Sequence, residues 1–146
     1  MLGGQLLLGT FLIVTTAMFH VICLVGLAAL LNRIDPKPGF ESSKPRMIYL
    51  MGIAVLVIIG VHTVEAWAWA GVYYFLGEFT DLANALYFSV VTVTTLGYGD
   101  IILSERWQLL ASFEAMGGII FFGASTAFLI GVIQHMFHDA ASIKKK

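Results

Sequence analysis

Charge is scarce in this sequence. Asp, Glu, Lys and Arg make up 12% of the 146 residues, about half the share found in a soluble domain. No charged residue precedes Arg33, and 59% of the chain is hydrophobic, with a mean hydropathy of +0.89. A surface exposed to water on every side cannot be built from this composition. The chain is long enough for one domain or one membrane bundle, and we predict the latter.

Cysteine and proline are almost as rare. The single cysteine, Cys23, lies in an apolar run, which excludes an intrachain disulfide and indicates a small buried side chain. The three prolines, Pro36, Pro38 and Pro45, fall within residues 32–46, "NRIDPKPGFESSKPR". This segment is predicted to be a loop.

Three long apolar runs remain, at about residues 5–31, 47–76 and 107–134. Each is long enough for a helix that crosses the hydrocarbon core, which needs about 20 residues. The first run lacks the basic start of a signal peptide and exceeds its usual apolar length, so it is predicted to be a retained helix. The segment 77–105 is too short and too mixed for a fourth crossing.

Apart from Arg106, the basic residues gather in two predicted polar segments. They are Arg33, Lys37, Lys44 and Arg46 after the first run, and Lys144, Lys145 and Lys146 at the end. Basic loops stay in the cytoplasm, so the N-terminus is predicted outside and the C-terminus in the cytoplasm of a cell membrane. The lysine tail has no interleaved aromatics, which indicates contact with the lipid bilayer and argues against nucleic acid.

The stretch "TTLGYGD", residues 94–100, has no helical preference although it lies between two apolar runs. It follows "LANALYFSVVTV", residues 82–93, a short helix that Thr80 or Asp81 could cap. A dozen residues can enter the membrane and return but cannot cross it. Non-helical backbone at that depth must be buried in protein or line a watery path.

The residue types in this stretch suit the binding of a dehydrated cation. Gly97 and Gly99 allow positive φ, so successive carbonyls can turn toward one axis. The Thr95 hydroxyl offers another oxygen. Rings of carbonyls can replace the water shell of an alkali cation, and several copies of the chain are needed to complete each ring.

With these motifs, residues 47–134 resemble the pore module of the tetrameric potassium channel family, in the prokaryotic two-helix style with an added N-terminal helix. The resemblance implies an all-α membrane protein, with three transmembrane helices plus a re-entrant pore helix and selectivity-filter loop per subunit, assembled as a homotetramer. It implies K⁺ as the bound and permeant ion. The implied K⁺ sites are formed by Thr95, Leu96, Gly97 and Tyr98, with Gly99 and Asp100 at the outer mouth.

The surroundings of the implied filter depart from the family pattern. Leu96 replaces the commoner valine, but its carbonyl is unchanged. Tyr87 and Phe88 stand where many members have tryptophans, and Val91 stands where some have a glutamate that bonds the aspartate after the filter. Together with Thr94 and Asp100, these three residues of the pore helix are the expected support of the filter. Asp100 thereby lacks the glutamate partner.

Ionisable residues within predicted spans are costly and usually functional. His62 and Glu65 share a helix face, and Glu114 lies at a similar depth. We expect these groups to meet beside the filter, with Glu65 or Glu114 reaching a pore-helix hydroxyl such as Thr92. They are either a buried tie between helices or a proton sensor. The pair His62 and Glu65 lacks the other ligands of a zinc site, which argues against a membrane protease.

Further candidates lie in the third run. His135 is either an ordinary complement of the helix dipole or part of a pH-sensitive inner gate. Gly117 and Gly118 allow close helix approach, and the family resemblance adds a gating bend there.

The predicted domains are an N-terminal helix and basic loop (1–46), a pore domain (47–138) and a basic tail (139–146). The spans lack an arginine series, which excludes the usual voltage sensor, and no soluble gating domain is expected after residue 134. We predict passive K⁺ conduction without catalysis. The alternatives are a weakly selective cation channel and a non-conducting regulatory subunit. The first helix is expected to pack around the second.

Overall fold

The computed structural model describes the backbone of residues 2–34 and 44–143, and the side chains of residues 2–34 and 45–135. It contains four helices: α1 (Leu2–Ile34), α2 (Lys44–Phe75), α3 (Leu82–Val93) and α4 (Gln108–Ile143). Three of them are long and apolar enough to span a membrane, and α3 is the short apolar helix between α2 and α4. The all-helical prediction with three spans is confirmed, and the range predicted for the short helix agrees with α3.

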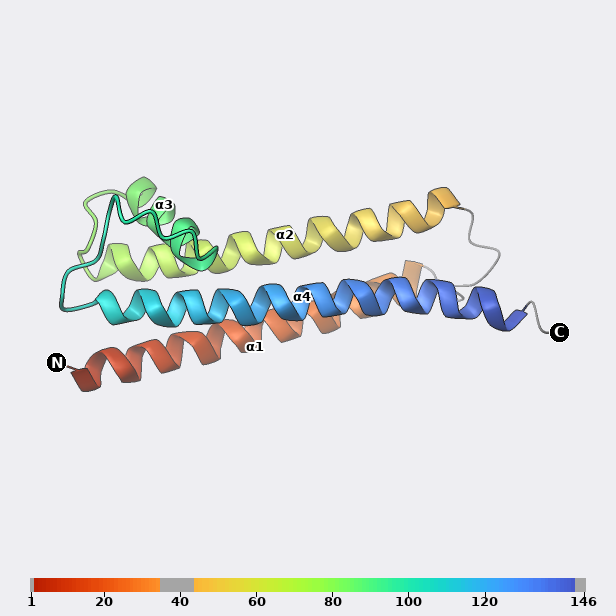
Figure 1. Cartoon of the computed structure of the whole chain (residues 1–146), viewed down its shortest axis with the longest axis horizontal. Helices are drawn as coiled ribbons and strands as arrows, with labels where there is room; N and C mark the ends of the chain where they lie inside the picture. The colour runs from red at the N-terminus through yellow and green to blue at the C-terminus, as the bar shows by residue number, and fades with distance from the viewer. Residues whose placement is uncertain (1, 35–43, 144–146) are drawn as a thin grey trace.

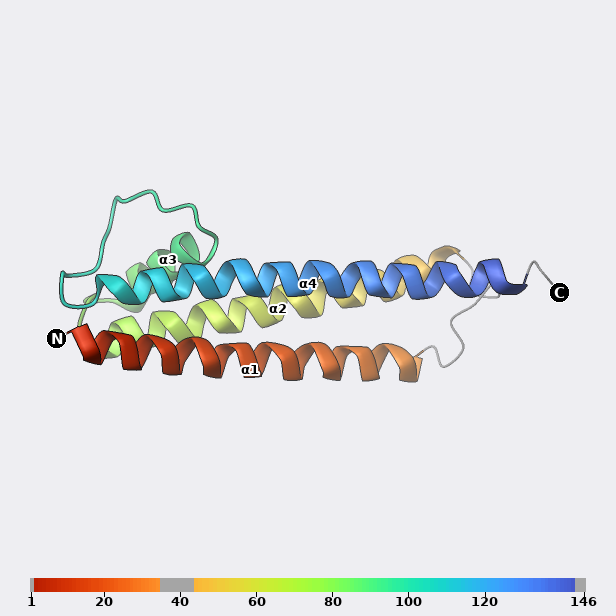
Figure 2. The ribbon, with the colours of Figure 1, turned by 60° about the horizontal axis from the view of Figure 1, so that its bottom comes forward.

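The three long helices run side by side along the length of the molecule (Figure 1). The end of α1, the start of α2 and the end of α4 lie at one end of the bundle. The start of α1, the end of α2, the start of α4 and the whole of α3 lie toward the other end (Figure 2). The end of α1, which contains Arg33, and the start of α2, which contains Arg46, are thus at the same end as the end of α4. The rest of both predicted basic segments, in residues 35–43 and 144–146, lies outside the described part.

The packing of α1 differs from the expectation, because α1 contacts α4 more extensively than α2. Gly9 of α1 makes the close approach possible. A Cβ atom added there would lie 2.5 Å from the Phe113 ring of α4. The Gln5 side-chain oxygen accepts a hydrogen bond of 3.2 Å from the Leu109 N–H, which satisfies one of the free amides in the first turn of α4. The prediction that α1 packs around α2 is therefore wrong at this end of the bundle.

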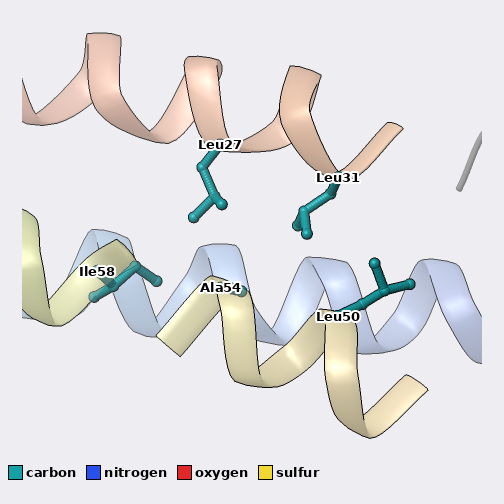
Figure 3. Close-up of a cluster of buried hydrophobic side chains, with 5 residues drawn as sticks. All are labelled: Leu27, Leu31, Leu50, Ala54 and Ile58. Carbon is teal, nitrogen blue, oxygen red and sulfur yellow. The ribbon is translucent and has the colours of Figure 1, made fainter. Parts of the chain in front are cut away.

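Toward the opposite end, α1 does meet α2. Leu27 and Leu31 of α1 point toward α2 and form a buried cluster with Leu50, Ala54 and Ile58 (Figure 3). Ala54 is fully buried, and its small side chain leaves room for the two leucines. Phe128, Leu129 and Val132 of α4 also pack against this cluster, so α1 contacts both α2 and α4 at this end.

The aromatic side chains near the end of α2 divide into two sets. Trp69 and Tyr73 are buried in a cluster with Phe88, Leu103 and Leu110, against which Leu8 and Leu12 of α1 also pack. Trp67, Tyr74 and Phe75 are exposed, as expected of an interfacial aromatic belt. The buried set therefore packs the helices together, and the exposed set is placed where an interfacial belt would need it.

A tight turn ends α2 and leads to α3. Gly77 has a φ of 77°, its N–H donates to the Tyr74 carbonyl and the Glu78 N–H donates to the Tyr73 carbonyl. This is the Schellman arrangement, which needs a residue with positive φ after the helix. The Glu78 carboxylate then accepts hydrogen bonds from the Ser104 N–H and hydroxyl at 2.6 and 2.8 Å, which joins the loops on either side of α3.

The C-terminal end of α3 lies directly against α4. A Cβ atom added at Gly118 would lie 2.1 Å from the Val93 carbonyl oxygen. Gly118 is ten residues beyond the start of α4, so the end of α3 lies about 15 Å along that helix. A helix of twelve residues thus ends well inside the bundle.

This contact predicts the effect of Gly118→Ala. The added methyl group cannot fit beside a backbone oxygen, so α3 must shift, and we expect a loss of about 1 to 3 kcal/mol in stability. Thermal unfolding in detergent measures it. Gly60→Ala, in the middle of α2 with nothing within 4 Å of the added atom, is the control and should not lower the midpoint. Equal midpoints for both variants would contradict the contact.

Candidate functional site: the short helix and the loop that follows it

The short helix α3 has a well-defined start. Asp81 is its N-cap, with the carboxylate accepting a hydrogen bond of 2.8 Å from the Asn84 N–H. Of the two caps that the sequence allowed, Asp81 is the one used. The helix ends at Thr94, whose hydroxyl donates to the Val90 carbonyl at 2.6 Å, and the chain leaves helical geometry at the predicted stretch.

The backbone after α3 alternates in handedness. Thr95, Gly97 and Gly99 have φ values of 61°, 55° and 73°, whereas Leu96 and Tyr98 between them do not have positive φ. In an ordinary strand successive carbonyls point to opposite sides. An alternation of this kind allows successive carbonyls to face the same side, and glycine adopts the positive φ without a steric cost.

In the described part of the chain, no hydrogen-bond donor reaches the carbonyl groups of this loop. The amides of residues 95–97 bond back to the last turn of α3, but no donor in the described part of the chain bonds to a carbonyl of residues 94–99. The side chains of Leu96 and Tyr98 are 57% and 67% exposed. Carbonyls without donors and exposed apolar side chains thus lie in one segment, which begins where α3 ends inside the bundle.

A cavity of about 370 Å³ separates this loop from the helices behind it. Its lining comes from three elements: Val91 and Thr92 of α3, Gly97 and Gly99 of the loop, and Ala111 and Ala115 of α4. The small residues on α4 leave this space open. The loop is therefore not packed tightly against α3 and α4.

One side-chain bond fastens the outer end of the loop. The Tyr87 hydroxyl of α3 donates to Asp100 at 2.7 Å. This bond holds the pKa of Asp100 below its ordinary value and raises the pKa of Tyr87. The Tyr87 hydroxyl is thus the side-chain partner of Asp100 in the described part of the chain, whereas the buried Val91 side chain offers no hydrogen bond.

The other expected support residues have different neighbours. Phe88 packs edge-on against Tyr73 and also contacts Phe79, with ring centroids 5.2 and 5.3 Å apart. Val91 is buried, and its carbonyl accepts hydrogen bonds from the amides of Leu96 and Gly97. Within the described residues, Tyr98 is in no ring contact.

Glu114 joins three helices behind the loop. It is fully buried on α4 and accepts a hydrogen bond of 2.6 Å from the Tyr73 hydroxyl of α2. Its other oxygen is hydrogen-bonded to the Ser89 hydroxyl of α3. The expectation that a buried glutamate reaches a pore-helix hydroxyl is correct, but the partner is Ser89, one helical turn before Thr92.

The hydrogen atoms of this group can be counted. Ser89 also lies 2.8 Å from the Ala66 carbonyl, which can only accept, so the serine hydrogen goes there. The contact between the Ser89 and Glu114 oxygens then has a hydrogen only if the Glu114 carboxyl group is protonated and donates a hydrogen bond to Ser89. A neutral carboxylic acid is also the form that an apolar interior favours.

Glu65 does not meet Glu114. It is buried on α2 between two histidines, with one oxygen 2.9 Å from His20 Nδ1 and the other 3.1 Å from His62 Nδ1. Ser125 of α4 lies 3.2 Å from Nε2 of both rings. The prediction that these groups gather beside the filter is wrong, since Glu65 and Glu114 form two separate groups. The reason is that the helix face shared by His62 and Glu65 turns toward α1.

His20 is the site residue that sequence reasoning missed. It is 1% exposed and lies in a helix without a charged residue before Arg33. An ionisable residue in a span is by default a candidate, and that signal alone could have found it. His20 therefore adds a third possible metal-ligating side chain beside His62 and Glu65.

The last candidates lie on α4, which is continuous from Gln108 to Ile143. Gly117 faces Phe121 and Ile13 of α1, at 3.3 and 3.4 Å from an added Cβ atom, and Gly118 faces α3. Both glycines therefore serve close packing, and the gating bend stays a prediction. His135 is exposed.

Comparison with known families agrees with this architecture. A family model described as "Ion channel" matches residues 61–135, which is just over half of the chain and includes α3, the loop and most of α4. The chain belongs to this ion channel family. With three apolar spans, it is a multi-pass membrane protein. No match was found among curated proteins or among solved structures.

The Glu114 group predicts a difference between two substitutions. Glu114→Gln keeps a donor for Ser89 and an acceptor for Tyr73, so the variant should unfold close to the parent temperature. Glu114→Ala leaves two buried hydroxyls without their partner and should cost on the order of 3 kcal/mol. Thermal unfolding in detergent distinguishes them. If Glu114→Gln were as damaging as Glu114→Ala, the carboxyl group would have to be ionised.

The Tyr87 bond predicts a shift with acid. Because the pKa of Asp100 is lowered, the bond is present at neutral pH and is lost as the pH falls through that lowered value. Tyr87→Phe should return the pKa of Asp100 toward its ordinary value, so the acid-induced change in ion flux should begin at higher pH than in the parent. Flux into liposomes between about pH 2.5 and 5, a range that includes the ordinary aspartate pKa and lower values, measures this, and coincident pH profiles would count against the bond.

Proposed function

We propose that this ion channel is a passive, K⁺-selective channel whose filter is formed by residues 95–99. The observation that carries the proposal is the row of unpaired carbonyls on a backbone of alternating φ. An unpaired carbonyl at membrane depth costs several kcal/mol. A dehydrated cation repays that cost, because the carbonyl oxygens substitute for its water shell.

The proposal requires a homotetramer around a central axis. One chain supplies only one arc of each carbonyl ring. Two observations support this. The exposed side chains of Leu96 and Tyr98 would be covered by neighbouring subunits. The loop, which has a cavity behind it, would be held in place by the same neighbours. The C-terminal end of α3 directs its partial negative charge toward the same region, which favours a cation over an anion.

The choice of K⁺ follows from the kind of oxygen available. Residues 95–99 offer peptide carbonyls and the Thr95 hydroxyl, and the first carboxylate, Asp100, comes after them. Neutral oxygens suit a large, weakly hydrated monovalent cation better than a divalent one, which prefers carboxylates. In this proposal Asp100, held by Tyr87, stands at the outer mouth.

We also propose the orientation. The basic ends of α1 and α2 face the cytoplasm of the cell membrane, so the filter opens toward the outside. The described spans contain no series of arginines, so opening is driven by something other than a charged helix that moves with voltage.

Flux measurements test the proposal directly. In liposomes loaded with K⁺, the purified protein should carry K⁺ faster than Na⁺ by an order of magnitude or more, and Ba²⁺ should block it. Gly99→Ala, at a φ of 73°, should reduce this preference because alanine strains that backbone. Gly52→Ala, in α2 with open space around it, is the control.

Each contrary outcome has a definite meaning. Equal K⁺ and Na⁺ flux would replace this proposal with the weakly selective cation channel. No flux from a correctly assembled protein would replace it with the non-conducting subunit.

A further inference from the structure

The buried cluster of His20, His62, Glu65 and Ser125 has no role in the proposed filter. It joins three helices, with His20 on α1, His62 and Glu65 on α2, and Ser125 on α4. His20, Glu65 and Ser125 are at most 4% exposed. His20 lies outside the residues that match the ion channel family, so a complete cluster needs the additional N-terminal helix.

Among the described residues, the Glu65 carboxyl group lacks a basic partner of the usual kind. In the described part of the chain, the ion pairs of Glu65 are with the two histidines, not with lysine or arginine. A buried carboxylate without a compensating cation is strongly unfavourable. Either a proton or a metal ion must accompany it.

A count of hydrogens sharpens this point. The four residues make four contacts: two between Glu65 and the Nδ1 atoms, and two between Ser125 and the Nε2 atoms. With Glu65 ionised and both imidazoles neutral, only three hydrogens are available, one on each ring and one on the serine. One contact is then always without a hydrogen.

We propose that this cluster binds one divalent transition-metal ion of the zinc type. The ion is coordinated by Nδ1 of His20, Nδ1 of His62 and the Glu65 carboxylate. Both Nε2 atoms then carry their hydrogen and donate to Ser125, whose oxygen has two lone pairs and accepts both bonds. The metal thereby satisfies every contact, and its charge offsets that of Glu65.

The measured geometry is close to what such an ion needs. One ligand atom from each of His20, His62 and Glu65 lies within 4.8 Å of the other two. Tetrahedral zinc with bonds of 2.0–2.1 Å holds neighbouring ligand atoms about 3.4 Å apart. The nitrogen–oxygen separations of 2.9 and 3.1 Å would lengthen slightly on binding, whereas a ligand pair as far apart as 4.8 Å would have to close by about 1.4 Å.

The rings are held in place by aromatic neighbours on α4. His20 stacks on Phe121 with centroids 5.1 Å apart, and His62 lies against Phe122 at 4.3 Å. With Ser125 fixing the tautomer, this is the outer-shell support that metal-bound histidines usually have. Two imidazoles and a carboxylate are nitrogen and oxygen ligands, which suit zinc and exclude calcium and magnesium.

Zinc content tests the proposal. Purified protein without a histidine tag, stripped with a chelator and dialysed against ZnCl₂ in detergent, should retain one zinc per chain. His20→Gln and Glu65→Gln should lose it at the same free zinc concentration. His135→Gln, which changes an exposed histidine of α4, should keep it. Thermal unfolding and gel filtration confirm that each variant is folded.

A second measurement separates a metal from a proton. Ser125→Ala removes only the outer-shell acceptor and should weaken zinc binding by about 10- to 100-fold, while Co²⁺ in the parent should give the visible absorption of a tetrahedral site. No retained zinc, or zinc binding that His20→Gln leaves unchanged, would overturn the inference and leave the cluster with a proton. Neither result bears on the K⁺ flux of the parent, so the two proposals can fail independently.

Discussion

Every backbone or side-chain polar group inside an apolar slab must find a partner within the protein, and this constraint accounts for most of the molecule. The long helices meet it with their own backbone bonds. At the helix ends, the free backbone groups are hydrogen-bonded through the Asp81 cap, the Gly77 turn and the Gln5 bond to α4. Glu114 meets it with two hydroxyls from two other helices. In the described part of the chain no donor bonds to the carbonyls of residues 94–99, and the proposed function rests on these groups.

The three spans, the short helix and its cap could be predicted from the sequence because each has a strong local signal. These signals are apolar runs of about 28 residues, a cluster of prolines, and an aspartate before an apolar segment of twelve residues. Each can be recognised without any knowledge of tertiary contacts. The positive φ at Gly97 and Gly99 followed from residue type. Thr95 also adopts positive φ, which its β-branched side chain would not suggest.

The contacts between helices could not be predicted in the same way. All-round apolar helices have no polar face to show which side packs where, so the sequence did not indicate that α1 lies mainly against α4. The pairing of Glu114 with Ser89 rather than Thr92 depends on the rotation of α3 about its axis, which Gly118 sets by admitting the Val93 carbonyl. The link from His20 to Glu65 spans 45 positions and depends on helices whose order in the bundle is a tertiary property.

The neutral form of Glu114 has an electrical consequence. A fixed charge at that depth would add a standing potential of its own to the field along a nearby ion path, and salt could not screen it there. With its proton in place, Glu114 contributes only a dipole. An ion that passes this part of the bundle then meets peptide and side-chain dipoles and no fixed charge from Glu114.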